Sequence, residues 1–200
     1  MNYIRTPLRR RFAVENIISV HYFPYTKDFF FPGESHDFWE LIIVDSGEVT
    51  VFDEKEIILK QGEGILHAPD KYHNIRANNV FSNIIIITFD CGAEELYSHA
   101  RKFTASSSIK FLAQMIINEA NRALKEPLDI VIQEKLDFKP DADYAAEHLI
   151  LNALELILIE IIRSDETPPV KKSQNRILAD KILYLLKNNI NKKVTIDEIA

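Results

Sequence analysis

Four side chains of this sequence are the best suited to chemistry: Glu34, His36, Glu40 and His73. Imidazole and carboxylate groups together bind Zn²⁺, Mn²⁺ or Fe²⁺, so these residues form a candidate metal site. Positions 34, 36 and 40 share parity, and in an extended segment without a bulge they point to one face of a sheet. His73 lies on a later predicted strand, so only the fold can bring it to the other three.

The sequence carries no pattern of a nucleophilic or nucleotide-dependent enzyme. Cys91 is the only cysteine, and its neighbours Asp90 and Gly92 give no reason for an activated thiol. Neither a GxGxxG run nor a phosphate-binding GxxxxGK[ST] run is present. We therefore predict no catalytic residues, no cofactor and a protein that is not an enzyme.

Composition places the chain among soluble globular proteins, because its 200 residues are 46% hydrophobic and 27% charged. A lone cysteine forms no internal disulfide and suits a reducing cytosol. Glu15 and Asn16 interrupt the apolar stretch after Arg9–Arg11, which is then too short for a signal peptide. The most apolar segment, 149–162, is shorter than the roughly 20 residues that cross a bilayer. We predict a cytoplasmic protein without a membrane span.

Charge is distributed unevenly along the chain, whose net charge is −6. Residues 171–200 hold seven basic and three acidic side chains, a net charge of +4, which leaves −10 for residues 1–170. A basic tail on an acidic body favours contact of the tail alone with a polyanion. A solvated helix face is the alternative explanation of the same charges.

The glycines mark a β region, because all five lie between positions 33 and 92. Apolar runs of strand length recur there between short turn-forming segments, and one more precedes them. The predicted strands are 17–25, 38–44, 49–52, 56–59, 64–68, 73–77 and 80–89. Many short strands joined by brief turns predict a barrel or a sandwich.

Beyond residue 93 the hydrophobic period changes from two to about 3.6, which predicts helices. Ser106–Ser108 can cap a helix that Pro127 ends, and 127–140 has no clear period. The first helix has one apolar stripe, formed by Ile109, Leu112, Ile116, Ala120 and Ala123.

A second long helix, predicted from Asp143 to Arg163, is apolar nearly all round. Two interpretations fit it: a subunit interface, or a central helix within one core. For the interface, the candidate dimerisation residues are Leu151, Leu154, Leu158 and Ile161.

The last residues are predicted to form a separate unit. Residues 165–175 include Pro168-Pro169 and polar side chains, and they are predicted to be an extended linker. An amphipathic helix follows, marked by Leu178, Ile182, Leu185 and Leu186, and the capping box from Thr195 to Glu198 starts another. The predicted organisation is therefore a domain at 1–164, a linker at 165–175 and an incomplete helical domain at 176–200.

Two segments of the sequence resemble the motifs of cupins. The run Gly33–Glu40, followed after six residues by Gly47, is similar to the first cupin motif, and Gly62–His73 resembles the second. His36, Trp39-Glu40-Leu41, Ser46-Gly47, Leu59, Gly62 and 69–73 are similar to the N-terminal effector domain of AraC-type transcription regulators. Residues 177–200 resemble the start of that family's helix-turn-helix domain.

The resemblance implies an α+β fold: a cupin-like barrel (double-stranded β-helix), then a helical pair and the start of an all-α helix-turn-helix domain. It implies a homodimeric regulator that senses a small-molecule effector, with a sugar as one candidate class. DNA would be bound through the complete C-terminal domain and not by these residues alone. Residues 1–16 would be an arm over the ligand or simply a solvated terminus.

For the effector pocket, strand parity nominates one set of inward side chains and turns Trp39 the other way. The candidate ligand-binding residues are His36, Phe38, Glu40, Ile42, His73 and Ile75. Metal-binding cupins have a histidine where this chain has Glu34, and the resemblance implies that AraC-type sensors commonly dispense with metal. The alternative function is a metal-dependent cupin enzyme, a dioxygenase or isomerase, that uses Glu34, His36, Glu40 and His73.

Overall fold

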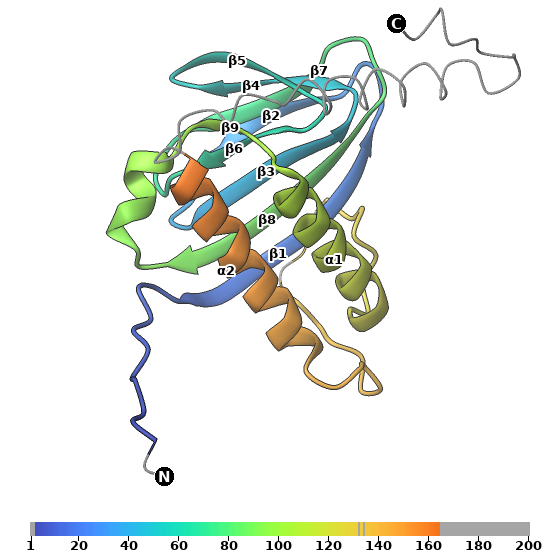
Figure 1. The fold of residues 1–200 in the computed structure, drawn as a ribbon. Helices are drawn as coiled ribbons and strands as arrows, with labels where there is room; N and C mark the ends of the chain where they lie inside the picture. Colours follow the sequence, from blue (N-terminus) through green and yellow to red (C-terminus); the bar gives the residue numbers. More distant parts are fainter. Residues whose placement is uncertain (1–2, 132, 134, 165–200) are drawn as a thin grey trace, which may run out of the picture. The chain divides into compact units, whose positions relative to one another are not determined.

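The computed structural model describes residues 3–131, 133 and 135–164, which form two antiparallel sheets and a helical layer (Figure 1). The first sheet has five strands in the order β1-β8-β3-β6-β9. Its central strands β3 and β8 are rich in isoleucine and valine, as expected for strands covered on both faces. The strands are β1 (Val14–Tyr25), β8 (Ser82–Cys91), β3 (Trp39–Ser46), β6 (Glu63–His67) and β9 (Lys102–Thr104).

The second sheet has four strands in the order β2-β7-β4-β5. Consecutive strands alternate between the sheets in much of the chain, which is the arrangement of a double-stranded β-helix or jelly roll. The strands are β2 (Phe30–Glu34), β7 (His73–Ala77), β4 (Glu48–Asp53) and β5 (Lys55–Lys60).

Apolar side chains from both sheets meet between them. Ile42 and Ile86 come from the five-stranded sheet, and Val51 and Ile75 come from the four-stranded sheet. The alternate residues of the same central strands, such as Leu41 and Ile87, point to the opposite face. The five-stranded sheet is therefore buried on both sides, inward against the second sheet and outward against the helices.

The helical layer covers the outward face of the five-stranded sheet (Figure 1). The helix α1 (Ser107–Ala123) begins as predicted, because the Ser106 hydroxyl accepts a hydrogen bond from the backbone N–H of Ile109. The helix α2 (Ala146–Ser164) packs along α1 and also contacts β1 and the 3₁₀ helix η1 (Glu94–His99). Together, the two helices and the sheet enclose the larger apolar cluster of the chain.

All seven predicted strands are present, with ends shifted by a few residues, and the α+β fold class is confirmed. Three elements were not predicted: β2, η1 and β9. The sequence of β2, FFPGE, contains a proline and a glycine, which are depleted in strands. The other two elements are only six and three residues long and lie where a helix was expected.

The helix boundaries differ from the prediction for local reasons. Helix α1 ends at Ala123, before Pro127, because Leu124 is extended and forms a β-bridge with Phe138. Helix α2 begins only after Ala145, whose φ of 61° lies in the left-handed region. Between the helices, the described residues 127–131, 133 and 135–140 form no helix or named strand, in agreement with the predicted irregular segment.

The predicted dimerisation residues of α2 lie mainly in the core of this chain. Leu154 and Leu158 are fully buried and Ile161 is 2% exposed, because α1, the sheet and η1 cover them. Leu151 is half-buried. The alternative of a central helix therefore accounts for three of the four residues, and their side chains are not free to meet a second subunit.

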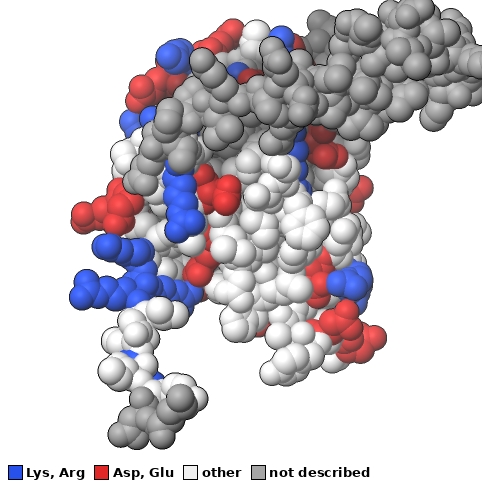
Figure 2. Space-filling view, viewed as in Figure 1, with Lys and Arg blue, Asp and Glu red and all other residues white. Residues whose placement is uncertain are grey.

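The outer surface of the helical layer is apolar in places. Phe111 of α1 is 67% exposed, and Leu149 and Leu156 of α2 are also exposed. Figure 2 shows that the middle of this face carries few charged side chains. Homodimerisation stays a prediction.

Residues 165–200, which hold the predicted linker and the start of the helix-turn-helix domain, lie outside the described residues. Within the described part of the chain, no helix is long and apolar enough to cross a membrane.

Candidate functional site

The four predicted metal-ligating side chains come together in the structure, although they do not share one strand. Glu34 ends β2, His36 lies in the connection, Glu40 is the second residue of β3, and His73 begins β7. Their ligand atoms lie within 4.8 Å of one another. The parity argument for positions 34, 36 and 40 was wrong because β2 and β3 belong to different sheets.

Gly33 makes this convergence possible. It has a φ of 111°, and a Cβ at this position would lie 2.6 Å from the backbone oxygen of His73. A register shift between Phe31 and Glu34 bends the end of β2 here and pairs Glu34 with His73. Only glycine allows this conformation and this close approach.

Backbone carbonyls fix the orientation of both histidine rings in the cluster. The Nδ1 atom of His36 lies 2.9 Å from the oxygen of Phe38, and the Nδ1 atom of His73 lies 2.9 Å from the oxygen of Lys71. A carbonyl oxygen only accepts hydrogen bonds, so each Nδ1 must donate. In the neutral ring, Nε2 then keeps its lone pair and is free to accept a hydrogen bond or to bind a metal.

Both Nε2 atoms face the buried carboxylate of Glu40. They lie 3.3 Å (His73) and 3.9 Å (His36) from its oxygens, and neither makes a well-aligned hydrogen bond. If both rings are neutral, the lone pairs of the two Nε2 atoms face the lone pairs of the Glu40 carboxylate oxygens. We call Glu34, His36, Glu40 and His73 the acceptor cluster, because two carboxylates and two Nε2 atoms turn acceptors toward one centre.

The electrostatics of the cluster favour a positive charge at that centre. Burial raises the pKa of the Glu40 carboxyl, but the facing imidazoles of His36 and His73 outweigh this and hold it below its usual range. Burial likewise lowers the pKa of His73, and the Glu40 carboxylate more than reverses that effect. A proton, a metal ion or a cationic group of a ligand would each supply the charge.

The acceptor cluster fits a metal ion by its donor chemistry. Two imidazoles and two carboxylates suit Zn²⁺, Mn²⁺ or Fe²⁺, and metal-bound histidines typically donate their other ring N–H to a carbonyl oxygen, as both Nδ1–H groups do here. Glu34, His36, Glu40 and His73 would hold the ion. A bound ion would supply Lewis-acid chemistry at this position.

His67 supports the cluster from behind, a role that the sequence did not reveal. Its ring is fully buried and stacks on that of His73, with ring centroids 4.5 Å apart. Its Nδ1 atom lies 3.5 Å from the Asp53 carboxylate, and this contact lowers the pKa of that carboxyl. Stacking fixes the plane of His73 and thereby its aim at Glu40.

A pocket of about 670 Å³ opens next to the acceptor cluster, between the two sheets, and we call it the inner pocket. This volume is in the range of small-molecule sites. Glu34, Glu40 and His73 of the cluster lie in its wall. The other polar lining residues include Ser19, His21, Thr88, Asp129 and Gln133, and the apolar ones include Phe23, Tyr25, Phe29, Phe31, Phe38, Ile42, Ile75 and Ile86.

Two further buried nitrogens in the wall of the inner pocket have no hydrogen-bond partner among the residues that the structure describes. They are Nδ1 of His21 and Nε2 of Gln133. Gln133 is held by its other end, since its Oε1 accepts a hydrogen bond from the backbone N–H of Val20. Buried polar atoms are normally satisfied, so these atoms mark places where a ligand or water is needed.

Most of the predicted ligand-binding residues lie in the wall of the inner pocket. Phe38, Glu40, Ile42, His73 and Ile75 line the inner pocket. His36 lies just behind its wall, with its ring stacked on Phe38 at 3.9 Å. Trp39 points the other way, into the outward cluster, and donates a hydrogen bond to the oxygen of Cys91.

Sequence reasoning missed two parts of the wall. His21, Phe23 and Tyr25 alternate along β1, so the parity rule applied to that predicted strand would have nominated them. Asp129, Val131 and Gln133 belong to the irregular segment beside β1, where Leu128 accepts a hydrogen bond from the N–H of Tyr22. No periodic pattern in that segment predicts this position.

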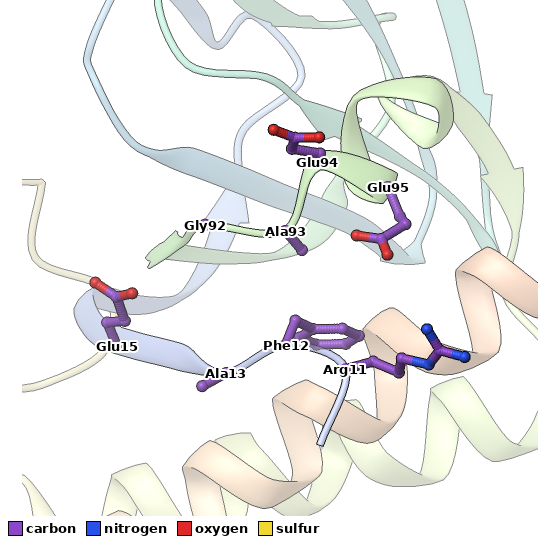
Figure 3. A pocket seen from close by; sticks show the side chains of 8 residues that line it. All are labelled: Arg11, Phe12, Ala13, Glu15, Gly92, Ala93, Glu94 and Glu95. Carbon is purple, nitrogen blue, oxygen red and sulfur yellow. The ribbon is translucent and has the colours of Figure 1, made fainter. Parts of the chain in front are cut away.

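A second hollow, of about 710 Å³, lies elsewhere, between the N-terminal segment and the end of β8. Figure 3 shows Glu95 of η1 across from Arg11 and Phe12. None of the residues lining this hollow carries a buried polar atom without a partner, as far as the described residues extend. The inner pocket is therefore the stronger candidate for a ligand.

The arrangement of strands decides the fold class. Two antiparallel sheets with alternating strands enclose a pocket, and three of its polar lining residues, Glu34, Glu40 and His73, come from the segments that resemble the two cupin motifs. The fold is cupin-like. In this cupin-like barrel, the acceptor cluster occupies one wall of the pocket and the aromatic side chains of β1 and β2 occupy another.

No protein-family model matches the chain, and no curated protein matches it either. A solved cupin superfamily protein from Desulfitobacterium hafniense is 14% identical, with a TM-score of 0.36 over 44% of this chain and 84% of that one. A predicted oxalate decarboxylase from Thermotoga maritima is 15% identical, with a TM-score of 0.34 over 35% and 64%. ToxT from Vibrio cholerae is 9% identical, with a TM-score of 0.46 over 96% and 69%. These similarities concern the fold alone.

Proposed function

We propose that this chain is the sensing part of an AraC-type transcription regulator and binds a small organic effector in the inner pocket. The observation that carries the proposal is the set of buried nitrogens without partners in the pocket wall, on His21, His73 and Gln133. Leaving such groups unpaired costs stability, and a ligand that pairs them recovers it.

The regulatory part of the proposal rests on the sequence. Residues 177–200 resemble the start of a helix-turn-helix domain, and residues 171–200 carry a net charge of +4. The effector would shift the population of two arrangements of the sensing domain, and the linker would pass this shift to the DNA-binding domain. The function is sensing rather than catalysis, in the cytoplasm and as a homodimer.

An unbiased ligand screen tests the proposal. Thermal unfolding of the 200-residue chain is followed with a library of sugars, amines, acids and aromatic compounds. A true ligand at 100 times its Kd stabilises the folded state by about 2.7 kcal/mol. The response should disappear in His73→Ala and persist in His148→Ala, which changes an exposed histidine on α2. Equal responses of both variants would contradict the proposal.

A metal-dependent cupin enzyme is the second candidate, and the geometry of the histidines favours it. Both Nδ1 atoms are fixed by carbonyls, and both Nε2 atoms face the carboxylate of Glu40. Metal analysis of the purified protein separates the candidates. Near-stoichiometric Fe, Mn or Zn that is lost in His36→Ala would support the enzyme, and a metal-free protein that binds a ligand would support the sensor.

A further inference from the structure

We propose that the inner pocket selects an organic cation: a ligand with an ammonium or amidinium group that meets the acceptor cluster and an apolar body that lies against the aromatic wall. This inference rests on the proposed function and specifies the class of its effector. It is carried by the charges of the pocket wall, by the direction of its acceptors and by its aromatic side chains.

Charge is the first argument. Three carboxylates line the pocket, those of Glu34, Glu40 and Asp129, and no described lining residue is a lysine or an arginine. Glu34 and Asp129 are exposed, whereas Glu40 is buried. A carboxylate or phosphate ligand would pass the carboxylates of Glu34 and Asp129 on the way in and meet that of Glu40 at the end of its path. A cation would meet attraction at both places.

The direction of hydrogen bonding is the second argument. Donation of each Nδ1–H to a carbonyl leaves the Nε2 atoms of the neutral His36 and His73 rings as acceptors, next to the oxygens of Glu40. His73 is 97% buried and lines the pocket, and its Nε2 atom, 3.3 Å from Glu40 Oε1, makes no well-aligned hydrogen bond with any described residue. An ammonium group carries three donors and no acceptor, which matches this arrangement. A neutral hydroxyl brings one donor and two further lone pairs.

The aromatic wall is the third argument, and it separates an organic cation from a bare metal ion. The rings of His21, Phe23, Tyr25 and Phe29 stack in sequence, with centroid distances of 4.8, 5.8 and 3.7 Å. A metal ion at the acceptor cluster would leave this wall and most of the 670 Å³ without a partner. Aromatic faces attract organic cations and also bury the apolar part of such a ligand.

The test compares ligands that share a body and differ in the head group. We would titrate the 200-residue chain with 2-phenylethylamine, 2-phenylethanol and 3-phenylpropionate, with shorter and longer homologues of each, and with D-glucose, by calorimetry in EDTA. The amine of the best-fitting length should bind at least about tenfold more tightly than the alcohol, as expected for a hydrogen bond to a charged partner, and the acid should not bind.

Variants locate the effect. Glu40→Gln keeps the shape of the side chain and removes its charge, so affinity for the amine should fall on the order of 10- to 100-fold. Glu34→Gln, at an exposed position that places little at risk in folding, should weaken amine binding by a smaller factor and leave alcohol binding unchanged. Glu56→Gln, on β5 outside the pocket, is the control and should bind like the wild type.

The outcomes separate this inference from the proposed function. If glucose, the alcohols or the acids bind as tightly as the amines, cation selectivity is overturned and the pocket remains an effector site. Amine binding that appears only when Zn²⁺ is added also overturns it, because a metal ion would then occupy the acceptor cluster. If no compound of this panel binds, the cation selectivity is contradicted, and the thermal unfolding screen with its wider library decides the effector site separately.

Discussion

The two faces of the five-stranded sheet use alternate residues of the same strands and differ in what they enclose. On the outward face, Leu41, Ile43 and Ile87 pack under the helices in an apolar layer. On the inward face, Glu40 and Thr88 occupy neighbouring positions in the wall of the inner pocket. The apolar packing of the outward face stabilises the fold. The inward face has fewer apolar contacts, because polar side chains line the pocket where a ligand would bind.

The two faces of the five-stranded sheet also differ in whether their buried polar atoms have hydrogen-bond partners. The buried nitrogens without partners on His21, His36, His73 and Gln133 belong to the inner pocket or its margin, and those of His67 lie directly behind it. On the outward side, Trp39 donates to the oxygen of Cys91 and Glu155 accepts from the N–H of Val14. Unpaired polar groups destabilise a fold, so their concentration at one pocket indicates a function.

The largest expected effect is loss of the outward core. Leu154→Ala should lower the free energy of unfolding by about 2–5 kcal/mol, because the side chain of Leu154, on α2, is fully buried against α1 and the sheet. Leu156→Ala, at a half-exposed position of the same helix, is the matched control and should change it by less than about 0.5 kcal/mol. Urea unfolding measures both. Similar losses at the two positions would mean that α2 does not pack as described.

A smaller effect is expected where the pocket depends on backbone shape. Gly33→Ala should cost about 1–3 kcal/mol, because φ at this position is 111° and the new Cβ would meet the backbone of His73. It should also abolish the thermal response to ligand, since Glu34 and His73 would move apart. Gly92→Ala is the control, because a Cβ there has no neighbour closer than 3.9 Å. A stable Gly33→Ala variant with full ligand response would contradict the account of the bend.

Gln133→Ala tests the irregular segment as part of the pocket wall. It should cost about 1–3 kcal/mol, because the buried N–H of Val20 loses its acceptor. The exposed helix residue Gln114 provides the control, and Gln114→Ala should leave stability nearly unchanged. Loss of ligand response in Gln133→Ala alone would confirm that the segment contributes to binding. Unfolding free energies equal to the wild type would show that the segment does not hold β1.

The smallest effect concerns Tyr22, whose side chain lies on the outward side of β1. Burial and a hydrogen bond to Asp45 raise the pKa of its phenol to about 12. The unfolded chain loses this proton near pH 10, so the folded state becomes progressively less stable as the pH rises from about 10 to 12. In Tyr22→Phe, the unfolding free energy should fall less steeply over that interval, and an unchanged slope would contradict the shift.

Much of the fold follows from patterns in the sequence. Apolar runs of strand length between turn-forming segments predicted β3, β4 and β7, and the 3.6-residue period with the cap at Ser106–Ser108 predicted α1. The sequence did not predict β2 because the strand contains a proline and a glycine. Its glycine allows the bend that brings Glu34 to the acceptor cluster, and glycine is not typical of strands. The apolar surface of α2 could not reveal its partner, since burial in the same chain and burial in a dimer require the same residues.

The candidate site was predictable in composition and not in geometry. Residue type alone nominated Glu34, His36, Glu40 and His73, which the structure brings together. The contributions of His67 and Gln133 depend on stacking and on a hydrogen bond across more than one hundred residues, which no local pattern encodes.

The most direct test of the central claim replaces the two buried members of the acceptor cluster, Glu40 and His73, by apolar side chains of similar size. In the double variant Glu40→Met/His73→Leu, we expect the free energy of unfolding to stay unchanged or to rise by about 1–4 kcal/mol, because two buried polar side chains that are imperfectly paired with each other are removed together. The thermal response to every ligand of the wild type should vanish. A variant that loses several kcal/mol of stability and still binds the ligand would show that the cluster is structural, and would contradict the account.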